Sequence, residues 1–409
     1  MYDLRFNFIP IISCLCGALF FFFTLSELTI FNSLTQYIIA ELNINSIEAS
    51  ALASVYFFSN AIWLIPGGIL LDIFPTRKLT LIFLSLCVIS SLALYFSGSL
   101  LVYITARFIQ GAGSAMSLLI VLRLGSQFFP RHAASIIGFM ISIGLLGGVF
   151  SENFFVWIVN TQYWRLAVLL NGLLGLLILI LSLFCLREPP RSKQVRKKIR
   201  YSRYAKLVCY QLRKVLNKSQ NLKCGLYIGL MNLPVFVLAT LWGNLYLKKV
   251  KSLGSVEAGF IISLIFVGEL VGSPILGWLS DRISSRLIPM KVSAVIAFLC
   301  ASMIIFFIHT PWLIAVIFFL IGFFISAQVM VYPLIIESNE PKIASTASGF
   351  GSLISNLVGA LAQGCFGIVI SLGLGDSSLN YQLAFGLLLV AFIISFGLCF
   401  FIEESSKCR

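Results

Sequence analysis

Charged residues and histidine are scarce in this sequence. Only 11% of its 409 residues are Asp, Glu, Lys or Arg, against about 25% in an ordinary soluble domain. His132 and His309 are the only histidines, which argues against a metal or catalytic site built on imidazole. The ten cysteines include no CxxC pair. Most of them lie inside apolar runs, where cysteine packs as a small apolar side chain.

A nucleotide-binding motif is also missing. The chain contains no Gly-Lys dipeptide, and therefore no phosphate-binding loop of the form Gly-x-x-x-x-Gly-Lys-(Ser/Thr). Hydrolysis of ATP within this chain is thus disfavoured. A membrane enzyme would need a converging nucleophile, base or metal site, and the sequence offers no suitable carboxylate cluster for one. We expect no catalytic residue, no metal and no cofactor.

Apolar residues are abundant instead. They make up 59% of the chain, which is more than a soluble protein of this size could bury in one core. Lipid explains the excess, because a helix needs about 20 mostly apolar residues to span a bilayer. Such segments can be placed at roughly 9–36, 49–71, 79–98, 101–126, 134–156, 164–186, 224–247, 257–279, 288–308, 312–336, 344–372 and 381–402. The first segment is too long for a signal-peptide core, so we expect it to be retained.

This pattern predicts an all-α integral membrane protein. Twelve transmembrane helices would form two pseudo-symmetric six-helix bundles, at residues 1–186 and 224–409. The linker between them, residues 187–223, contains thirteen Lys and Arg and one acid, Glu188. Such a run suits nucleic acid, but the simpler account is topological, because cytoplasmic loops of membrane proteins keep Lys and Arg.

The charge bias also predicts orientation and surroundings. We expect the linker and both termini in the cytoplasm, with the linker beside anionic lipid headgroups. No nucleic-acid partner is expected. A bacterial inner membrane is the expected location, and a monomer is the expected state.

An internal repeat links the two halves. "GILLDIFPTR" at 68–77 and "GWLSDRISSR" at 277–286 both read Gly-x-x-x-Asp, with Arg five residues after the Asp. Each copy joins the second and third helix of its half. The offset of 209 between Gly68 and Gly277 also relates Gly113 to Gly322, in the fourth helix of each half. Many transporters are built from two similar halves, with the substrate site at their interface near the bilayer midplane.

Both copies, and a motif in the fourth helix, match signatures of one family. Between helices 2 and 3 that signature is Gly-x-x-x-Asp-(Arg/Lys)-x-Gly-x-(Arg/Lys)-(Arg/Lys). The first copy keeps Gly68, Asp72, Arg77 and Lys78, and departs at Ile73 and Pro75. The second copy keeps Gly277, Asp281, Arg282 and Arg286. "RFIQGAG" matches the family's Arg-x-x-Gln-Gly-x-Gly at Arg107, Gln110, Gly111 and Gly113. Over essentially its whole length the chain resembles the major facilitator superfamily.

Two finer resemblances concern the substrate. "GLLGG" at 144–148 is similar to the glycine-rich signature of the family's antiporters, but it lacks that signature's Gly-Pro pair, which argues against antiport. "LWGNLYL" at 241–247, "GSPILGWLSDR" at 272–282 and "IESNEPKIASTASGF" at 336–350 resemble a bacterial branch related to lysosomal dipeptide transporters. The second resemblance implies a dipeptide or a similar polar solute.

The repeated motifs are the expected gates on the cytoplasmic side. An aspartate there can cap the N-terminus of a helix in the other half, whose dipole favours an anion. Asp72, with Arg77, would latch that side shut when the protein faces outward; a solvated turn is the alternative. Gly68 would permit a close helix approach. Because the second copy follows the family pattern more closely, we expect Asp281 to matter at least as much as Asp72.

Two charged residues stand inside apolar helices at similar depth. Glu27 lies about two turns before the expected end of the first helix, and Arg107 about two turns after the start of the fourth. Ionisable groups inside a membrane face a cavity or a partner. We expect Glu27 and Arg107 to pair, with Gln110 in the same pathway, and a proton or an anionic substrate to compete for the pairing. A purely structural pair is the alternative.

The remaining polar residues of the helices are weaker candidates. Glu269, near the middle of the eighth helix, is either a second proton site or substrate ligand, or a protonated packing residue. Glu152, near the outer end of the fifth, is either an outer-gate contact or merely interfacial, and we favour the latter. Residues of the seventh and tenth helices that are either ligands or packing residues are Asn232, Trp242, Asn244, Tyr246 and Gln328.

These observations predict a secondary active transporter that moves a small polar solute by alternating access. The expected solute is a dipeptide, an amino acid or an organic anion, carried by a symporter or uniporter, with protons as the candidate coupling ion. A drug/proton antiporter is the alternative within that class. A non-transporting receptor or helper subunit is the alternative outside it, and retention of Asp72, Arg107 and Asp281 argues against it.

Overall fold

Helices account for nearly all of the structure. A computed structural model of the chain describes residues 8–96, 98–129, 133–161, 163–188, 213–306, 308, 310–340, 343–371 and 377–404, and this part contains no strand. Most of the basic linker, residues 189–212, lies outside the described residues, and so does the expectation that it contacts lipid headgroups. Because lipid cannot accept backbone hydrogen bonds, helices are what apolar segments of this length form in a membrane.

The described residues include twelve helical spans long and apolar enough to cross a membrane. In the first half they comprise α1 (Phe8–Leu42), α2 (Ser46–Ile73), α3 (Thr76–Phe96), α4 (Leu100–Phe128), α5 (Ala133–Phe150) with η1 (Ser151–Phe155) and α6 (Val156–Thr161), and α7 (Trp164–Cys185). In the second half they comprise α9 (Ser219–Met231) with η3 (Pro234–Trp242) and α10 (Gly243–Lys251), α11 (Ser255–Ile283), α12 (Leu287–Phe306), α13 (Pro311–Ile325) with η4 (Ser326–Met330) and α14 (Val331–Ser338), α15 (Ala344–Ser371) and α16 (Ser377–Leu398). The expected all-α membrane fold is confirmed.

Three of the spans change helix type along their length. A π-helical turn, η1, separates α5 from α6, and a longer π-helical segment, η3, separates α9 from α10. A short 3₁₀ segment, η4, separates α13 from α14. Such turns rotate the side chains that follow them and are frequent at functional sites. Pro234 begins η3, where its missing N–H removes one hydrogen bond of a regular helix.

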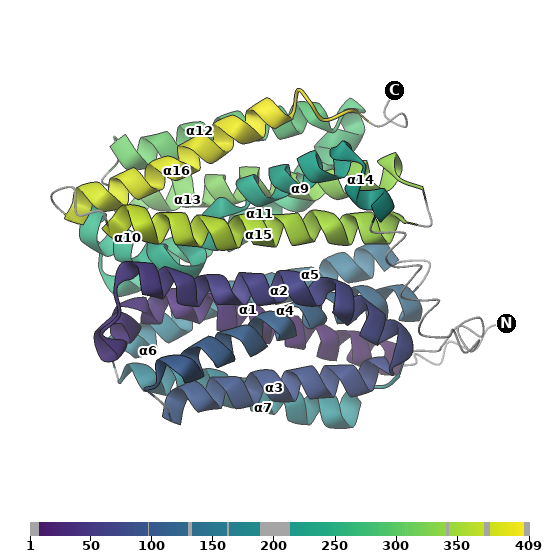
Figure 1. Cartoon of the computed structure of the whole chain (residues 1–409), viewed down its shortest axis with the longest axis horizontal. Helices are drawn as coiled ribbons and strands as arrows, with labels where there is room; N and C mark the ends of the chain where they lie inside the picture. Colours follow the sequence, from purple (N-terminus) through teal and green to yellow (C-terminus); the bar gives the residue numbers. More distant parts are fainter. Residues whose placement is uncertain are drawn as a thin grey trace.

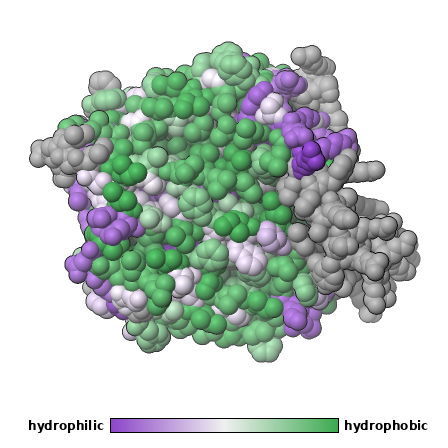
Figure 2. All heavy atoms as spheres, viewed as in Figure 1, coloured by the Kyte–Doolittle hydropathy of each residue, from purple (hydrophilic) through white to green (hydrophobic). Residues whose placement is uncertain are grey.

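The helices form two bundles that lie side by side. Figure 1 shows α1 to α7 in one bundle and α9 to α16 in the other. We call the end where α1 begins and α16 ends the terminal face, and the opposite end, where α1 meets α2 and α10 meets α11, the far face. Figure 2 shows an apolar band across the middle of one side, with hydrophilic residues toward the two ends. Exposed Phe and Leu side chains such as Phe139, Phe184 and Leu361 are therefore suited to lipid.

Glycines bring helices into backbone contact at corresponding points of the two halves. A Cβ at Gly111 of α4 would collide with the carbonyl oxygen of Tyr56 in α2. A Cβ at Gly322 of α13 would collide with the carbonyl oxygen of Ile265 in α11. The counterpart of Gly322 is therefore Gly111, and not Gly113 as the constant offset predicts. A Cβ at Gly113 would instead collide with the Cys87 side chain of α3.

Two long helix contacts join the bundles, α2 with α15 and α5 with α11. In the first contact, Ser54 Oγ donates a hydrogen bond to the carbonyl oxygen of Ala360 at 2.9 Å. Toward the far face, a Cβ at Gly367 of α15 would collide with the Ser50 hydroxyl. Phe57 of α2 also meets Phe236 of η3 edge to face, with ring centroids 4.9 Å apart. The bundles are thus closely packed toward the far face.

Gly111→Ala should destabilise the fold. Its methyl group must displace the Tyr56 carbonyl, and overpacking of this kind costs about 1–3 kcal/mol. Gly386→Ala on α16 is the matched control, because a Cβ there meets nothing within 4 Å and alanine favours a helix over glycine. Thermal unfolding of the detergent-solubilised protein should show a lower Tm for Gly111→Ala only. Equal Tm values for both variants would contradict the contact.

Candidate functional site

A small cavity lies inside the first bundle. Its volume is about 20 Å³, room for a single water-sized group. It is lined by residues of α1, α3, α4 and α7, namely Glu27, Ile30, Phe31, Leu34, Ile38, Ser91, Leu94, Tyr103, Arg107, Gln110, Trp164, Val168 and Asn171. The side chains of Glu27 and Arg107 are each only 1% exposed. The residues expected to lie close together do so.

The contacts of Arg107 differ from the expected ion pair. Its Nη1 donates to the backbone carbonyl oxygen of Glu27 at 3.2 Å and to Gln110 Oε1 at 3.2 Å. Glu27 Oε1 instead accepts from the Ser91 hydroxyl at 2.5 Å. The guanidinium also lies over the ring of Phe31, with its central carbon 4.4 Å from the ring centroid. The face of an aromatic ring attracts a cation such as this one. Helix packing therefore holds the carboxylate and the guanidinium beside each other without a direct bond between them.

Several polar atoms of this cavity have no hydrogen-bond partner. They are Glu27 Oε2, Arg107 Nε, Arg107 Nη2 and the Tyr103 hydroxyl. A buried polar atom without a partner is costly, and most of all when it belongs to a charged group. The cavity thus presents both unused donors and an unused acceptor to whatever enters it.

Glu269 lies in the second bundle. Its Oε1 accepts from Gln328 Nε2 of η4 at 2.9 Å, and both residues are buried. The hydroxyls of Tyr332 and Ser352, on α14 and α15, share a hydrogen bond of 3.0 Å. Glu269 and Gln328, two of the candidates, thus form a polar pair that joins α11 to η4 in the tenth span.

The aromatic candidates of the seventh span pack within their own bundle. Trp242 meets Tyr381 of α16 edge to face at 6.2 Å, and Tyr246 stacks on Phe385 of α16 at 3.7 Å between centroids. Trp242 Nε1 and the Tyr246 hydroxyl have no hydrogen-bond partner. Asn232, which ends α9, also has a partnerless side-chain oxygen. These side chains therefore pack within the second bundle and do not line the cavity beside Glu27.

Gln363 of α15 has a role that the sequence analysis missed. It is fully buried, and its Nε2 donates to the carbonyl oxygen of Phe236 and to Thr240 Oγ1, the latter at 2.7 Å. This amide thus adds a second donor to the Phe236 carbonyl, which also accepts from Thr240 Oγ1 within η3. The only signal in the sequence is an amide in an apolar helix, which does not reveal its partner.

Glu152 is far more buried than its place near a helix end suggests. It is 0% exposed and lies between the two bundles. Its Oε1 accepts from Asn32 Nδ2 of α1 at 3.1 Å, and its Oε2 accepts from Asn244 Nδ2 of α10 at 3.3 Å. The backbone N–H of Asn244 donates to Asn32 Oδ1 at 3.3 Å. The expectation that Glu152 is merely interfacial is therefore wrong, and we call these three residues the Glu152 ring.

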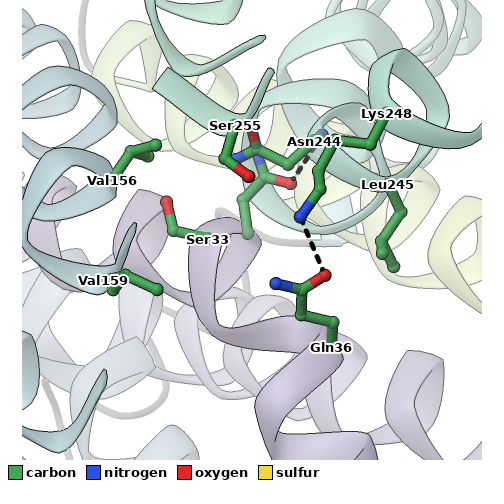
Figure 3. Close-up of a pocket in the computed structure, with 9 residues that line it drawn as sticks. Ser33, Gln36, Val156, Val159, Asn244, Leu245, Lys248 and Ser255 are labelled. Atoms are coloured by element: carbon green, nitrogen blue, oxygen red, sulfur yellow. Dashed lines mark hydrogen bonds between the residues drawn. The ribbon is translucent and has the colours of Figure 1, made fainter. Parts of the chain in front are cut away.

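A second small cavity adjoins the Glu152 ring between the bundles (Figure 3). It is also about 20 Å³ in volume, and its lining includes Ser33 and Val159 from the first bundle and Leu245 from the second. Lys248 Nζ donates across it to Gln36 Oε1 at 3.1 Å. Polar atoms from both halves thus meet again beside the ring.

The repeated motifs lie at the terminal face. The side chains of Asp72 and Asp281 are outside the part of the chain that the structure describes. A Cβ at Gly68 or at Gly277 would meet nothing within 4 Å. The close helix approach expected at Gly68 is therefore not made in this conformation. Lys78 is exposed.

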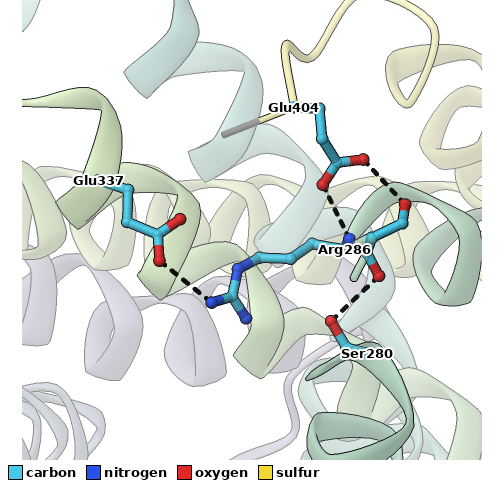
Figure 4. Close-up of polar contacts among 5 residues, drawn as sticks. Ser280, Arg286, Glu337 and Glu404 are labelled. Atoms are coloured by element: carbon cyan, nitrogen blue, oxygen red, sulfur yellow. Dashed lines mark hydrogen bonds and ion pairs between the residues drawn. The ribbon is translucent and has the colours of Figure 1, made fainter. Parts of the chain in front are cut away.

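The arginines of the motifs contact their own halves. Arg77 Nη2 donates to the carbonyl oxygen of Leu183 at 2.7 Å. Arg286 Nη2 donates to Glu337 Oε1 of α14 at 3.1 Å (Figure 4). Arg282 is exposed, and its guanidinium lies 5.2 Å from the Trp278 ring centroid. Each of these contacts ties the motif to its own bundle.

A carboxylate beyond the last helix of each half caps the third helix of that half. Glu188 accepts from the backbone N–H groups of Thr76 and Arg77, each at 2.9 Å. Glu404 accepts from the backbone N–H of Arg286 at 2.8 Å (Figure 4). The first N–H groups of a helix have no internal partner, and the helix dipole favours an anion beside them. The repeat thus extends to a pair of caps that the motif comparison did not include.

Curated relatives of this chain are transporters. The probable galactarate/D-glucarate transporter GudP of Escherichia coli (strain K12) is 22% identical over 368 residues, which are 81% of this chain and 80% of that protein. The lysosomal dipeptide transporter MFSD1 of Danio rerio is 23% identical over 80% of this chain and 73% of its own length. A probable hexose phosphate transport protein of Chlamydia pneumoniae is 37% identical over 114 residues. That match spans only 27% of this chain and 25% of that protein.

The fold has close counterparts among solved structures. A mutant of the nucleoside transporter NupG superposes with a TM-score of 0.78 over 96% of this chain and 99% of that one, at 13% identity. That likeness concerns the fold alone. The sequence profile of the Major Facilitator Superfamily matches residues 15–363. With its twelve spans and two bundles, the chain therefore belongs to the Major Facilitator Superfamily.

Proposed function

We propose that this transporter moves a small organic anion together with a proton. The observation that carries the proposal is Arg107, a buried guanidinium with two nitrogens that have no hydrogen-bond partner. A buried charge requires a compensating partner. The planar fork of an arginine suits a carboxylate or a phosphate in particular, because both can accept two parallel hydrogen bonds.

The size of the cavity limits what binds there. At about 20 Å³ it accommodates one water-sized group and not a whole solute. The anionic group of the solute would thus approach Arg107, while the rest of the solute would contact other parts of the pathway. Gln110, which already bonds to Arg107, holds the guanidinium in place for this contact.

Glu27 supplies the link to protons. When its carboxylate is ionised, its negative charge offsets Arg107 and disfavours a second anion nearby. When it takes up a proton, the charge of Arg107 is left uncompensated, and binding of an anion becomes more favourable. Each ligand thus raises the affinity for the other, which is the reciprocity that symport requires.

The relatives support an anionic solute. GudP is named for galactarate and D-glucarate, which are sugar acids with two carboxylates. The Chlamydia pneumoniae relative is named for hexose phosphate and the Danio rerio relative for dipeptides. These solutes share an anionic group, so a dipeptide remains a candidate beside the sugar acids. The missing Gly-Pro pair after "GLLGG" disfavours the drug/proton antiporter.

The charge distribution supports an orientation. Arg77, Lys78 and Arg286 lie at the terminal face, together with both ends of the basic linker. Since cytoplasmic loops keep Lys and Arg, we assign the terminal face to the cytoplasm, with residues 1–186 and 224–409 as the two moving domains. A bacterial inner membrane fits this orientation and the bacterial relatives.

Glu27→Gln should abolish the pH dependence of transport. In proteoliposomes, uptake of radiolabelled D-glucarate by the unaltered protein should rise with external acidity, whereas the variant cannot take up a proton at this position. Glu257→Gln, at an exposed carboxylate of α11, is the control and should keep the normal profile. A normal pH profile for Glu27→Gln would exclude its role as the proton carrier.

Arg107→Gln should weaken anion binding. Loss of one partner from a buried charge pair costs at least about 2 kcal/mol, which is roughly thirtyfold in affinity. Arg107→Lys keeps the charge without the fork, so it should bind more tightly than Arg107→Gln but less tightly than the unaltered protein. The increase in Tm on adding D-glucarate, glucose 6-phosphate or dialanine measures the affinity. Equal increases in all three proteins would contradict a role for Arg107.

A further inference from the structure

We propose that Glu152 is the positioning residue that holds the far face of the transporter closed, through the hydrogen-bonded ring it forms with Asn32 and Asn244. This inference concerns the motion of the two bundles. It does not depend on which solute is carried or on proton coupling.

The ring connects three separate elements. Glu152 lies on η1, Asn32 on α1 and Asn244 on α10, and each residue bonds to the other two. The carboxylate divides its oxygens, one to an amide of its own bundle and one to an amide of the other bundle. All three side chains are at least nine-tenths buried. Exclusion of water strengthens such hydrogen bonds, and a buried polar group that loses its partner is costly.

The local backbone places Glu152 at the contact between the bundles. η1 rotates the side chains of the fifth span out of the register of α5. Gly259 of α11 allows the second bundle to approach, because a Cβ there would collide with the carbonyl oxygen of Glu152. On the opposite side, η3 ends at Trp242, two residues before Asn244. Glu152 and Asn244, which form the side-chain hydrogen bond between the bundles, thus lie on η1 and just after η3, both of them π-helical.

The surrounding contacts agree with a closed far face. Thr35 Oγ1 donates to the carbonyl oxygen of Leu241 at 3.3 Å, and Lys248 donates to Gln36, so two further hydrogen bonds join α1 to the seventh span near the ring. The adjoining cavity admits only a water-sized group. Opening this face must therefore break the two bonds of the ring that cross between the bundles, both of which Asn244 donates. Glu152 accepts one of them, and its other oxygen holds Asn32, the acceptor of the second.

Substitutions separate the hydrogen bonds from the charge. Glu152→Ala removes both bonds of the carboxylate, and Asn244→Ala removes the side-chain bond to the other bundle. Glu152→Gln keeps the shape without the charge. Its oxygen can still accept from Asn32, and its amide can donate to Asn244 Oδ1, which has no partner and can be presented by rotation of the Asn244 amide. Asn244→Asp instead sets two carboxylates against each other, which opposes closure.

Cysteine labelling measures opening of the far face without any substrate. Val159 of α6 is 6% exposed and lines the cavity beside the ring. Val159→Cys, in the full-length protein in proteoliposomes, should react slowly with a membrane-impermeant maleimide from the far face. Protein without this substitution gives the background from native thiols. Labelling of native Cys365 after detergent solubilisation, where its exposed side chain is reachable in every variant, measures the amount of each protein. A cooperative thermal unfolding transition with a Tm close to that of the parent shows that each variant is folded.

Glu152→Ala and Asn244→Ala should each raise the labelling rate of Val159→Cys about tenfold or more, because losing a buried hydrogen bond changes an equilibrium constant by roughly that factor. Asn244→Asp should raise it at least as much. Glu152→Gln should label close to the slow rate of the parent. Slow labelling of both alanine variants would overturn the proposal, and so would labelling of Glu152→Gln as fast as that of Glu152→Ala. Failure of anion uptake in every protein would bear only on the proposed function.

Discussion

The hydrocarbon core of a membrane offers no hydrogen bonds, and this constraint organises the whole molecule. The backbone satisfies its own polar groups by forming helices, and side chains with polar groups are withdrawn between the helices. Glu27, Glu152 and Glu269 each lie in such a place, and each accepts a hydrogen bond from a hydroxyl or an amide of a different helix. The few charged residues of the spans therefore report where helices meet.

The same constraint explains why the fold could be predicted from the sequence. Hydropathy locates spans without any knowledge of their neighbours, and the Gly-x-x-x-Asp repeat reveals the duplication. The changes of helix type were not predicted, because η1 has no marker in "SENFF" and only Pro234 marks η3. The register of the repeat was also missed in the fourth helix. A constant offset pairs Gly113 with Gly322, whereas backbone contact pairs Gly111 with it.

The candidate site was predicted in location but not in its bonds. Depth in the membrane placed Glu27 and Arg107 together. Packing alone determines that the guanidinium contacts Phe31 and Gln110 while the carboxylate bonds to Ser91. The Glu152 ring was harder to foresee. Its members come from positions 120 and 92 residues away from Glu152 along the chain, and nothing in a single sequence shows that they converge.

Glycines also bring the two bundles together near the far face. A Cβ at Gly259 would collide with the carbonyl oxygen of Glu152, and a Cβ at Gly367 with the Ser50 hydroxyl, each across the contact between the bundles. Opening of the far face, as we propose it, must therefore separate more than the Glu152 ring. It must also part Gly259 from the carbonyl oxygen of Glu152 and Gly367 from the Ser50 hydroxyl.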